Sequence, residues 1–221
     1  VIYSTLIAAY LRWFETRREP RRARRLVDVF EMLTYRQRYE SLLEKSGRDS
    51  LTGVLDRGRL DAEGASWLAS SLAGGGSASV LLLDVDHFKS INDGHGHAGG
   101  DEVLRRLGAR LSATMRATDR IYRYGGEEFV LVYPEMSVQP SLEVIDRIRQ
   151  ALAQAIRAAG LPSFTCSFGV THSSVGDSVA VIVRAADAAL YTAKDLGRNR
   201  VIYADQALAS SYFGSGNQRS R

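Results

Sequence analysis

The chain has 221 residues, of which 45% are hydrophobic and 24% charged, a composition typical of one globular domain with a short appendage. Its single cysteine, Cys166, excludes a disulfide framework and a multi-cysteine metal site, and it fits a reducing cytoplasm. The net charge of +4 is concentrated at the N-terminus. Residues 1–48 carry 11 Lys and Arg against 6 Asp and Glu, and the rest carries 18 against 19. The basic residues therefore lie outside the domain, which argues against a nucleic-acid-binding domain.

The first 48 residues predict helices ahead of the domain. A start at Val1 indicates a fragment of a longer protein. Residues 1–20 contain an apolar run too short to span a bilayer, followed by arginines. They are either the inner end of a membrane helix with positive flanking charge or a helix that packs against a partner. Residues 21–48 have apolar side chains at helical spacing, which fits either a helix on the domain surface or a coiled-coil signalling stalk.

From residue 49 onward, strands and helices alternate after a turn-rich junction. Apolar runs and turn signals predict strands at 79–86, 163–172 and 199–204 and a hairpin at 119–134 centred on Gly125 and Gly126. Helical spacing predicts helices at 59–73, which Asp56 is placed to cap, and at 101–115, 141–158 and 179–198. The order of these strands and helices, with an extra helix after the first strand, predicts an α+β fold of the ferredoxin-like, polymerase-palm-like βααββαβ type. We expect the flanking helices on one side of the sheet, and a flexible tail at 205–221.

Two acidic segments are expected to meet at one end of this sheet. Asp84 lies near the end of the strand at 79–86, and Glu127 follows the glycine turn of the hairpin. If that strand lies beside the hairpin, the two carboxylates converge. Carboxylate oxygens beside a loop that can hold phosphates favour Mg²⁺. The alternative interpretation is a pair of ordinary acidic turn residues.

Five segments in chain order resemble the GGDEF family of diguanylate cyclases, from about Asp49 to Tyr203. They are DSLTGVLDR (49–57), LLDVDHFKSIND (82–93), GHAGGD (96–101), RYGGEEF (123–129) and ADAALYTAKDLGRNRV (186–201). The fourth is the family signature, with Glu in its variable third position. Asp56 stands where the family usually has Asn, a departure in a turn that casts little doubt on the chemistry.

The resemblance implies that the protein condenses two GTP into cyclic di-GMP and releases two pyrophosphates. It implies that Asp84, the Val85 carbonyl and Glu127 hold Mg²⁺, for which Mn²⁺ is a substitute. The metal would bridge the triphosphate and lower the pKa of the attacking 3′-hydroxyl. Glu127 would also accept the proton. For Glu128 a direct catalytic role and a structural hydrogen bond are both open.

The resemblance also assigns residues to GTP. The implied contacts are His87, Phe88, Asn92, His97, Asp101, Gly125, Gly126, Lys194 and Arg198. Lys89, at the start of a helix, would stabilise charge developing on the phosphate as part of the catalytic set. Lys194 and Arg198 lie four residues apart on one expected helix face, so both would reach the same triphosphate. The structural alternative for these basic residues is a solvated face.

Asn92 and Asp101 would recognise guanine. A carboxylate accepts from the N1–H and 2-amino groups of guanine, and adenine offers neither donor, so GTP is favoured over ATP. His97 would line this pocket by family analogy, and the alternative is a turn histidine. His95 and His97 also suggest zinc, but no neighbouring residue completes a tetrahedral set, so we expect none.

Arg116 and Asp119 match the family's RxxD inhibitory site, six positions before the glycine turn. Arginine suits the O6/N7 edge of guanine and phosphate, and aspartate suits the N–H groups. Arg147 falls where the family supplies another arginine. We therefore expect cyclic di-GMP to act as product and inhibitor. The alternative is a helix-end salt bridge between Arg116 and Asp119.

One GTP site per domain implies a homodimer, which a stalk would align. The resemblance indicates a cytoplasmic domain, attached to an inner-membrane sensor if residues 1–20 are the end of a membrane helix, with no nucleic-acid partner. The competing function is a non-catalytic nucleotide receptor on the same fold. A purely structural dimerisation module would leave the metal and phosphate groups unexplained.

Overall fold

The computed structural model describes residue 32 and residues 47–73, 77–159, 163–205 and 207. The chain divides into two compact units, of which Gly47–Arg221 contains almost all of the described residues. The segments predicted at 1–20 and 21–48, and the tail predicted at 205–221, fall almost entirely outside the described residues. Within the described part of the chain, no helix is long and apolar enough to cross a membrane.

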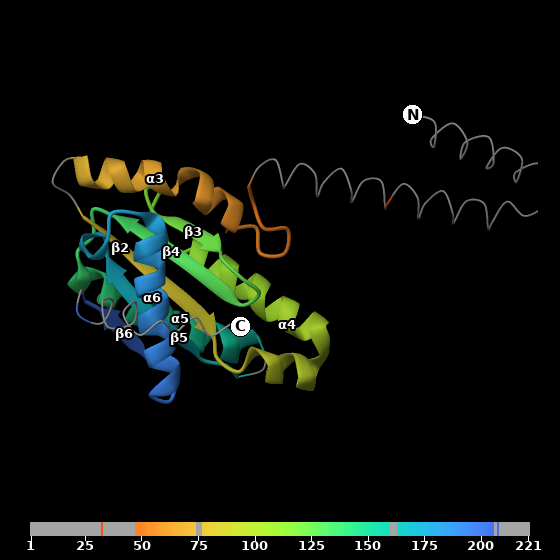
Figure 1. The fold of residues 1–221 in the computed structure, drawn as a ribbon. Coiled ribbons are helices and arrows are strands. Elements are labelled where there is room, and N and C mark those ends of the chain that lie inside the picture. Colours follow the sequence, from red (N-terminus) through yellow and green to blue (C-terminus); the bar gives the residue numbers. More distant parts are fainter. Residues whose placement is uncertain (1–31, 33–46, 74–76, 160–162, 206, 208–221) are drawn as a thin grey trace, which may run out of the picture. The chain divides into compact units, whose positions relative to one another are not determined.

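The described residues form one six-stranded mixed sheet with the order β1-β3-β4-β2-β5-β6 (Figure 1). The strands are β1 (Leu55–Asp56), β2 (Ala78–Val85), β3 (Arg120–Arg123), β4 (Glu128–Pro134), β5 (Cys166–His172) and β6 (Val201–Ala204). Strand β2 is central because it pairs antiparallel with both β4 and β5. Strands β3 and β4 form the predicted hairpin, and β4 lies beside β2 as expected. The predicted fold class is confirmed.

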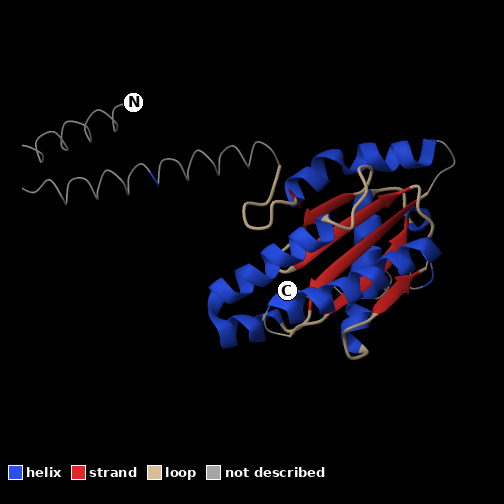
Figure 2. Cartoon of the chain, turned by 180° about the vertical axis from the view of Figure 1, so that it is seen from behind, coloured by secondary structure: helices blue, strands red, loops and turns tan. Residues whose placement is uncertain are grey.

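Helices cover both faces of this sheet (Figures 1 and 2). They are α3 (Arg57–Ala73), α4 (Phe88–Ser112), α5 (Val138–Ala159) and α6 (Val179–Asp195), with a 3₁₀ turn, η1 (Ser173–Val175). Alternate residues of β2 serve the two faces: Leu81 and Leu83 pack in the core with α4 and α5, whereas Val80 and Leu82 pack with α3 and α6. The expectation of helices on one side only is therefore wrong. All eight residues of β2 are buried, and an apolar run without alternation is typical of a strand covered on both faces.

Helix α6 lies unusually close to β5. A Cβ atom at Gly169 would come within 1.9 Å of the Ala186 carbonyl oxygen and 2.4 Å of the Leu190 nitrogen, so only glycine fits there. The face of α6 toward the sheet is rich in alanine, with Ala185, Ala186, Ala188, Ala189 and Ala193 buried. Small side chains on both elements bring the helix backbone near the sheet and fix the position of its C-terminal end.

Helix α4 contains the extra helix that was expected after the first strand. Its backbone is non-helical at Gly96, with φ of 71° and ψ of 166°, so the element consists of two helical arms joined at a kink. Glycine adopts this positive φ at little cost. The Gly- and His-rich segment at 91–101 is thus mostly helical and folds back on itself.

Candidate active site

Acidic side chains meet where β2 ends and β4 begins. Asp84 and Glu128 are paired directly across the two strands, so their side chains lie on the same face of the sheet. Glu127 precedes β4, and its carbonyl oxygen accepts a hydrogen bond from the Val85 N–H at 3.4 Å. The structure therefore brings together the residues implied for the metal, and it places Glu128 beside them.

Asp84 is a buried carboxylate in an environment that disfavours its charge. Its residue is 5% exposed, and burial raises its pKa from 3.8 to about 6, with the neighbouring Glu127 and Glu128 adding to the rise. Lys194 opposes the rise: its Nζ lies 2.8 Å from Asp84 Oδ2. The ion pair with Lys194 therefore offsets the effect of burial on this pKa only in part.

These oxygen atoms suit a hard divalent cation. Mg²⁺ binds proteins through one or two carboxylates and takes its remaining ligands from water and substrate phosphates. Asp84, Glu127 and the Val85 carbonyl are a donor set of this kind. Among the described residues, no group of three or more His, Cys, Asp and Glu side chains forms a ready-made metal site.

The glycine turn is held by an ion pair that our sequence analysis did not identify. Arg123 donates from Nη1 to both carboxylate oxygens of Asp49 at 3.0 Å, and from Nη2 to the Gly126 carbonyl at 2.7 Å. Asp49 also accepts from the N–H and hydroxyl of Thr52, at 2.8 and 2.6 Å. Both charged residues lie in the motifs quoted above, where they could have been noticed as candidates for an ion pair. Their pairing itself depends on β1 lying beside β3.

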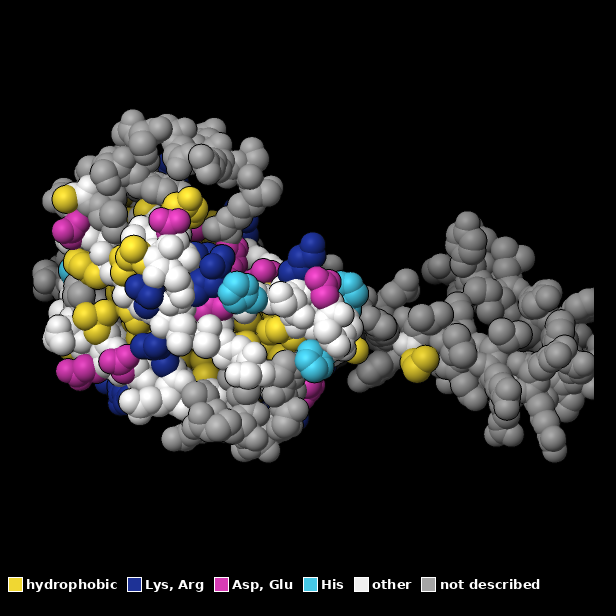
Figure 3. Space-filling model, turned by 90° about the horizontal axis from the view of Figure 1, so that it is seen from below, with side chains coloured by type: hydrophobic (Ala, Val, Ile, Leu, Met, Phe, Trp, Pro, Cys, Tyr) yellow, Lys and Arg dark blue, Asp and Glu magenta, His cyan; other side chains and the backbone are white. Residues whose placement is uncertain are grey.

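The start of α4 lies directly after the acidic strand. His87 precedes the helix with φ of 57°, and Phe88 and Lys89 are its first residues. The first N–H groups of a helix lack intrahelical acceptors and attract anions. The Lys89 side chain is exposed. Viewed from below, histidine, basic and acidic side chains gather on one face of the domain (Figure 3).

The kink of α4 brings the expected guanine contacts together. A Cβ atom at Gly100 would lie 2.0 Å from Asn92 Oδ1 and 3.0 Å from a ring carbon of Phe88, so Asn92 on the first arm touches the second arm next to Asp101. The Asp101 side chain is 48% exposed and lies 3.9 Å from Arg105. His97 is exposed immediately after the kink.

Arg198 does not share a helix face with Lys194, so that expectation is wrong. Helix α6 ends at Asp195, and Gly197 continues with φ of 105°. The Gly197 and Arg198 N–H groups donate to the carbonyls of Lys194 and Ala193, at 3.3 and 2.9 Å, which is a Schellman motif. The Gly in LGRN signals this helix end, whereas our predicted helix ran to residue 198.

The turn after α6 is anchored by Asp86 instead. The buried Asp86 carboxylate accepts from the Asn199 N–H at 3.0 Å and from the hydroxyls of Thr165 and Ser167 at 2.6 and 2.7 Å. It therefore joins the end of β2, the start of β5 and the turn that carries Arg198. No role was predicted for Asp86 from the sequence.

The RxxD residues and Arg147 lie close enough to Tyr133 for their charges to act on its hydroxyl. Asp119 is 8% exposed, and its Oδ2 accepts from the backbone N–H of Arg116 at 2.8 Å. Burial raises the pKa of Tyr133, Asp119 adds to the rise, and Arg147 and Arg116 oppose it, so all three charged groups are near this ring. The Tyr133 hydroxyl is buried, and the described residues offer it no hydrogen-bond partner.

Comparisons with known proteins agree with this geometry. Residues 46–200 match the family described as diguanylate cyclase, GGDEF domain. The chain is 39% identical over 173 residues to the diguanylate cyclase DgcM of Escherichia coli (strain K12), covering 78% of this chain and 42% of DgcM. It is 37% identical over 159 residues to the diguanylate cyclase VdcA of Vibrio cholerae, covering 70% of this chain and 46% of VdcA. It thus spans less than half the length of either relative.

A solved structure supports the same match. The GGDEF domain of DgcB from Caulobacter crescentus, in complex with c-di-GMP, superimposes with a TM-score of 0.67 and 32% sequence identity. The match covers 72% of this chain and 94% of the DgcB domain.

Proposed function

The chain belongs to the GGDEF family, and from that premise we propose that it is a diguanylate cyclase that makes cyclic di-GMP from two GTP. The observation that carries the proposal is the buried Asp84 carboxylate, whose pKa is raised to about 6 beside Glu127 at the glycine turn. A carboxyl group whose pKa is perturbed by burial and by a specific charged partner is a candidate functional residue. The fold of DgcB bound to c-di-GMP supports the product assignment.

In the proposed reaction, the 3′-oxygen of one GTP attacks the α-phosphorus of the other. The bond from that phosphorus to the oxygen bridging the β-phosphate breaks, and pyrophosphate leaves. Glu127 takes the proton of the hydroxyl as general base. Repetition with the roles exchanged closes the ring, so the stoichiometry is two GTP to one cyclic di-GMP and two pyrophosphates.

Asp84, Glu127 and the Val85 carbonyl would hold Mg²⁺, or Mn²⁺ in its place, which when bound neutralises phosphate charge and lowers the pKa of the attacking hydroxyl. Lys194 would then exchange its contact with Asp84 for the triphosphate. The start of α4 at Phe88 and Lys89 would bind the phosphates, with His87 preceding it. Glu128, across from Asp84, would add negative charge that favours the cation.

The remaining nucleotide contacts are proposed on the same basis. Asn92 and Asp101 would recognise the guanine edge between the two arms of α4, with His97 at the kink. Gly125 and Gly126 would let the backbone approach the nucleotide closely. Arg198 would contact phosphate from the turn after α6, held there by the anchored Asn199 N–H.

Each domain would bind one GTP, so the reaction would require a homodimer in which two domains face each other. The stalk at 21–48 would align them, and a sensor preceding it would set the activity. We propose that the domain spanning 49–204 acts in the cytoplasm, with any membrane attachment coming from the N-terminal side.

Product inhibition would act through Arg116, Asp119 and Arg147. The effect of all three charges on Tyr133 supports a site in which arginines would contact guanine and phosphate and Asp119 would contact N–H groups. The same cluster would serve a non-catalytic receptor for cyclic di-GMP, which is the second candidate function.

The first test is chromatography of GTP reactions with Mg²⁺, using protein stripped of bound nucleotide. The parent and Glu143→Gln, a matched change on the exposed side of α5, are expected to make cyclic di-GMP, and Glu127→Gln none. Arg116→Ala is expected to relieve inhibition by added product, and Arg110→Ala, an exposed arginine of α4, to leave it unchanged. If the parent makes no product but binds cyclic di-GMP through Arg116, the receptor replaces the enzyme.

A further inference from the structure

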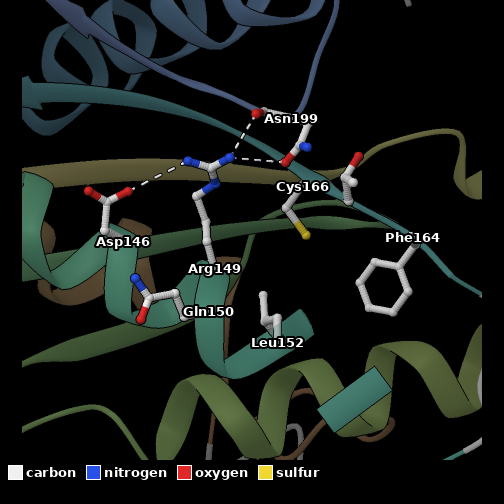
Figure 4. A pocket seen from close by; sticks show the side chains of 8 residues that line it. Asp146, Arg149, Gln150, Leu152, Phe164, Cys166 and Asn199 are labelled. Carbon is white, nitrogen blue, oxygen red and sulfur yellow. Dashed lines mark hydrogen bonds and ion pairs between the residues drawn. The ribbon is translucent and has the colours of Figure 1, made fainter. Parts of the chain in front are cut away.

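A cavity of about 370 Å³ lies between α5 and the start of β5, where Cys166 pairs with Val85 at the end of β2 (Figure 4). One wall is polar and is formed by Arg149 and Asp146 of α5 and by Asn199. The other wall is apolar, with Leu152 and Phe164 on either side of Cys166. In Figure 4 the Cys166 sulfur points into the space between Leu152 and Phe164. The cavity thus has the Arg149–Asp146 ion pair at its polar end and an apolar side around Cys166.

The polar end offers a guanidinium whose present partners are weak. Arg149 Nη2 donates to the carbonyl and side-chain oxygens of Asn199, at 2.9 and 3.2 Å. Its Nη1 lies 3.5 Å from Asp146, whose side chain is 66% exposed. A neutral amide and a long, solvated ion pair are poorer partners for arginine than a carboxylate that binds both of its parallel N–H groups. The guanidinium is therefore suited to an anionic ligand of bidentate shape.

The apolar side of the cavity is suited to the aromatic ring of a ligand. A cavity of about 150 Å³ lined by apolar side chains is enough to hold benzene. The volume here, about 370 Å³, accommodates a larger aromatic group together with its acid. Phe164 offers a ring to stack against, and the sulfur of Cys166 makes favourable contacts with aromatic rings. A ligand that fills this end would also shield the thiol, which is the only one in the chain.

The cavity is connected to the proposed nucleotide site through the turn after α6. Arg149 holds the side chain and carbonyl of Asn199, and Asp86 holds its N–H at 3.0 Å. Asn199 and the preceding Arg198 both have positive φ values, of 47° and 62°. Non-glycine residues adopt this conformation at a cost, so the surrounding bonds must maintain it. Loss of the Arg149 bonds would loosen the turn that carries Arg198.

We propose that this cavity binds a small aromatic carboxylate, and that the carboxylate takes Arg149 away from Asn199 and so loosens the turn at 197–199. The apolar wall holds the ring and the guanidinium holds the acid. Arg198, the proposed phosphate contact, then loses its fixed position. The binding site itself is independent of the proposed cyclase activity, because neither the cavity nor the turn requires turnover to be observed.

The test uses the full chain, free of nucleotide, with indole-3-acetate as the probe and neutral indole-3-acetamide as its matched control. N-ethylmaleimide labelling of Cys166, followed by intact mass, reports how often the cavity opens. A ligand at ten times its Kd is expected to slow labelling about tenfold. Hydrogen exchange of a peptide covering 197–200 is expected to become faster with indole-3-acetate and to stay unchanged with the amide.

Variants of Arg149 test whether its guanidinium binds the carboxylate of the ligand. Arg149→Met is expected to abolish the protection by indole-3-acetate, whereas Arg184→Met, an exposed arginine of α6, is expected to keep it. If Arg149→Met does not fold, Arg149→Lys is used instead, because it keeps the positive charge but lacks the two parallel N–H groups of arginine. In Arg149→Lys, indole-3-acetate should protect Cys166 from labelling less than it does in the parent. Equal protection by the amide, protection that survives Arg149→Met, no protection at all, or unchanged exchange at 197–200 would each overturn the proposal. None of these readouts depends on cyclic di-GMP formation.

Discussion

Replacing the buried Asp84 by Asn should make the pH dependence of stability smaller. The folded-state pKa of Asp84 is about 6 and its ordinary value is 3.8, so between these pH values the folded protein binds a proton that the unfolded chain has released. Stability therefore falls as pH rises through this window. The difference between the two pKa values corresponds to about 3 kcal/mol, taken as an upper bound. Asp84→Asn, which cannot ionise, avoids this loss.

The assay is urea unfolding of the metal-free protein, measured at several values from pH 4 to pH 7.5. The stability of Asp84→Asn relative to the parent should increase by about 1–3 kcal/mol across this range. Asp61→Asn, an exposed aspartate of α3, should show a constant difference. A constant difference for Asp84→Asn would mean that the ion pair with Lys194 balances burial, and a difference that moves in the opposite direction would mean that the ion pair outweighs it. Added Mg²⁺ at pH 7.5 should stabilise the parent and not this variant.

Three further changes test the packing around the site. Asp49→Asn removes a half-buried ion pair at the glycine turn and should lower the unfolding free energy by about 1–3 kcal/mol in urea titrations; no change would mean that the pair is solvated. Gly125→Ala places a Cβ atom 2.6 Å from Glu128 Oε2, whereas no described atom lies within 4 Å of a Cβ at Gly126. Because Glu128 Oε2 is the far end of a flexible side chain and can move aside, neither Gly125→Ala nor Gly126→Ala should lower the melting temperature appreciably; a clear drop for Gly125→Ala alone would show that the Glu128 side chain is held in place. Tyr133→Phe removes a buried hydroxyl to which the described residues offer no partner, and it should leave stability equal or higher by about 0.5–1 kcal/mol, as measured in urea, because no hydrogen bond is lost; a clear decrease would show that the hydroxyl is satisfied.

Local patterns in the sequence were sufficient for most of the elements and for the family. The glycine turn between apolar runs predicts the hairpin, Asp56 caps α3 by accepting from the Arg59 N–H at 2.8 Å, and the ordered motifs identify the GGDEF domain. Such signals depend on residues a few positions apart, whose geometry is set by the period of a helix or strand. There were two exceptions. The helix at α6 was extended past Gly197, and the short strand β1 lies in a segment that was predicted as a turn-rich junction.

Tertiary structure alone decided which distant side chains meet. The ion pair between Arg123 and Asp49 joins residues 74 positions apart in the sequence. The hydrogen bond from the Asn199 N–H to Asp86 joins residues 113 positions apart. These contacts depend on the strand order and on how closely α6 approaches β5, which no local period encodes. The environment of the Lys194–Asp84 pair also depends on this packing. The pKa of Asp84 is raised mainly by its burial between packed layers. The sequence by itself therefore determined most of the elements and the family, whereas the packing of layers determined the charge balance of the site.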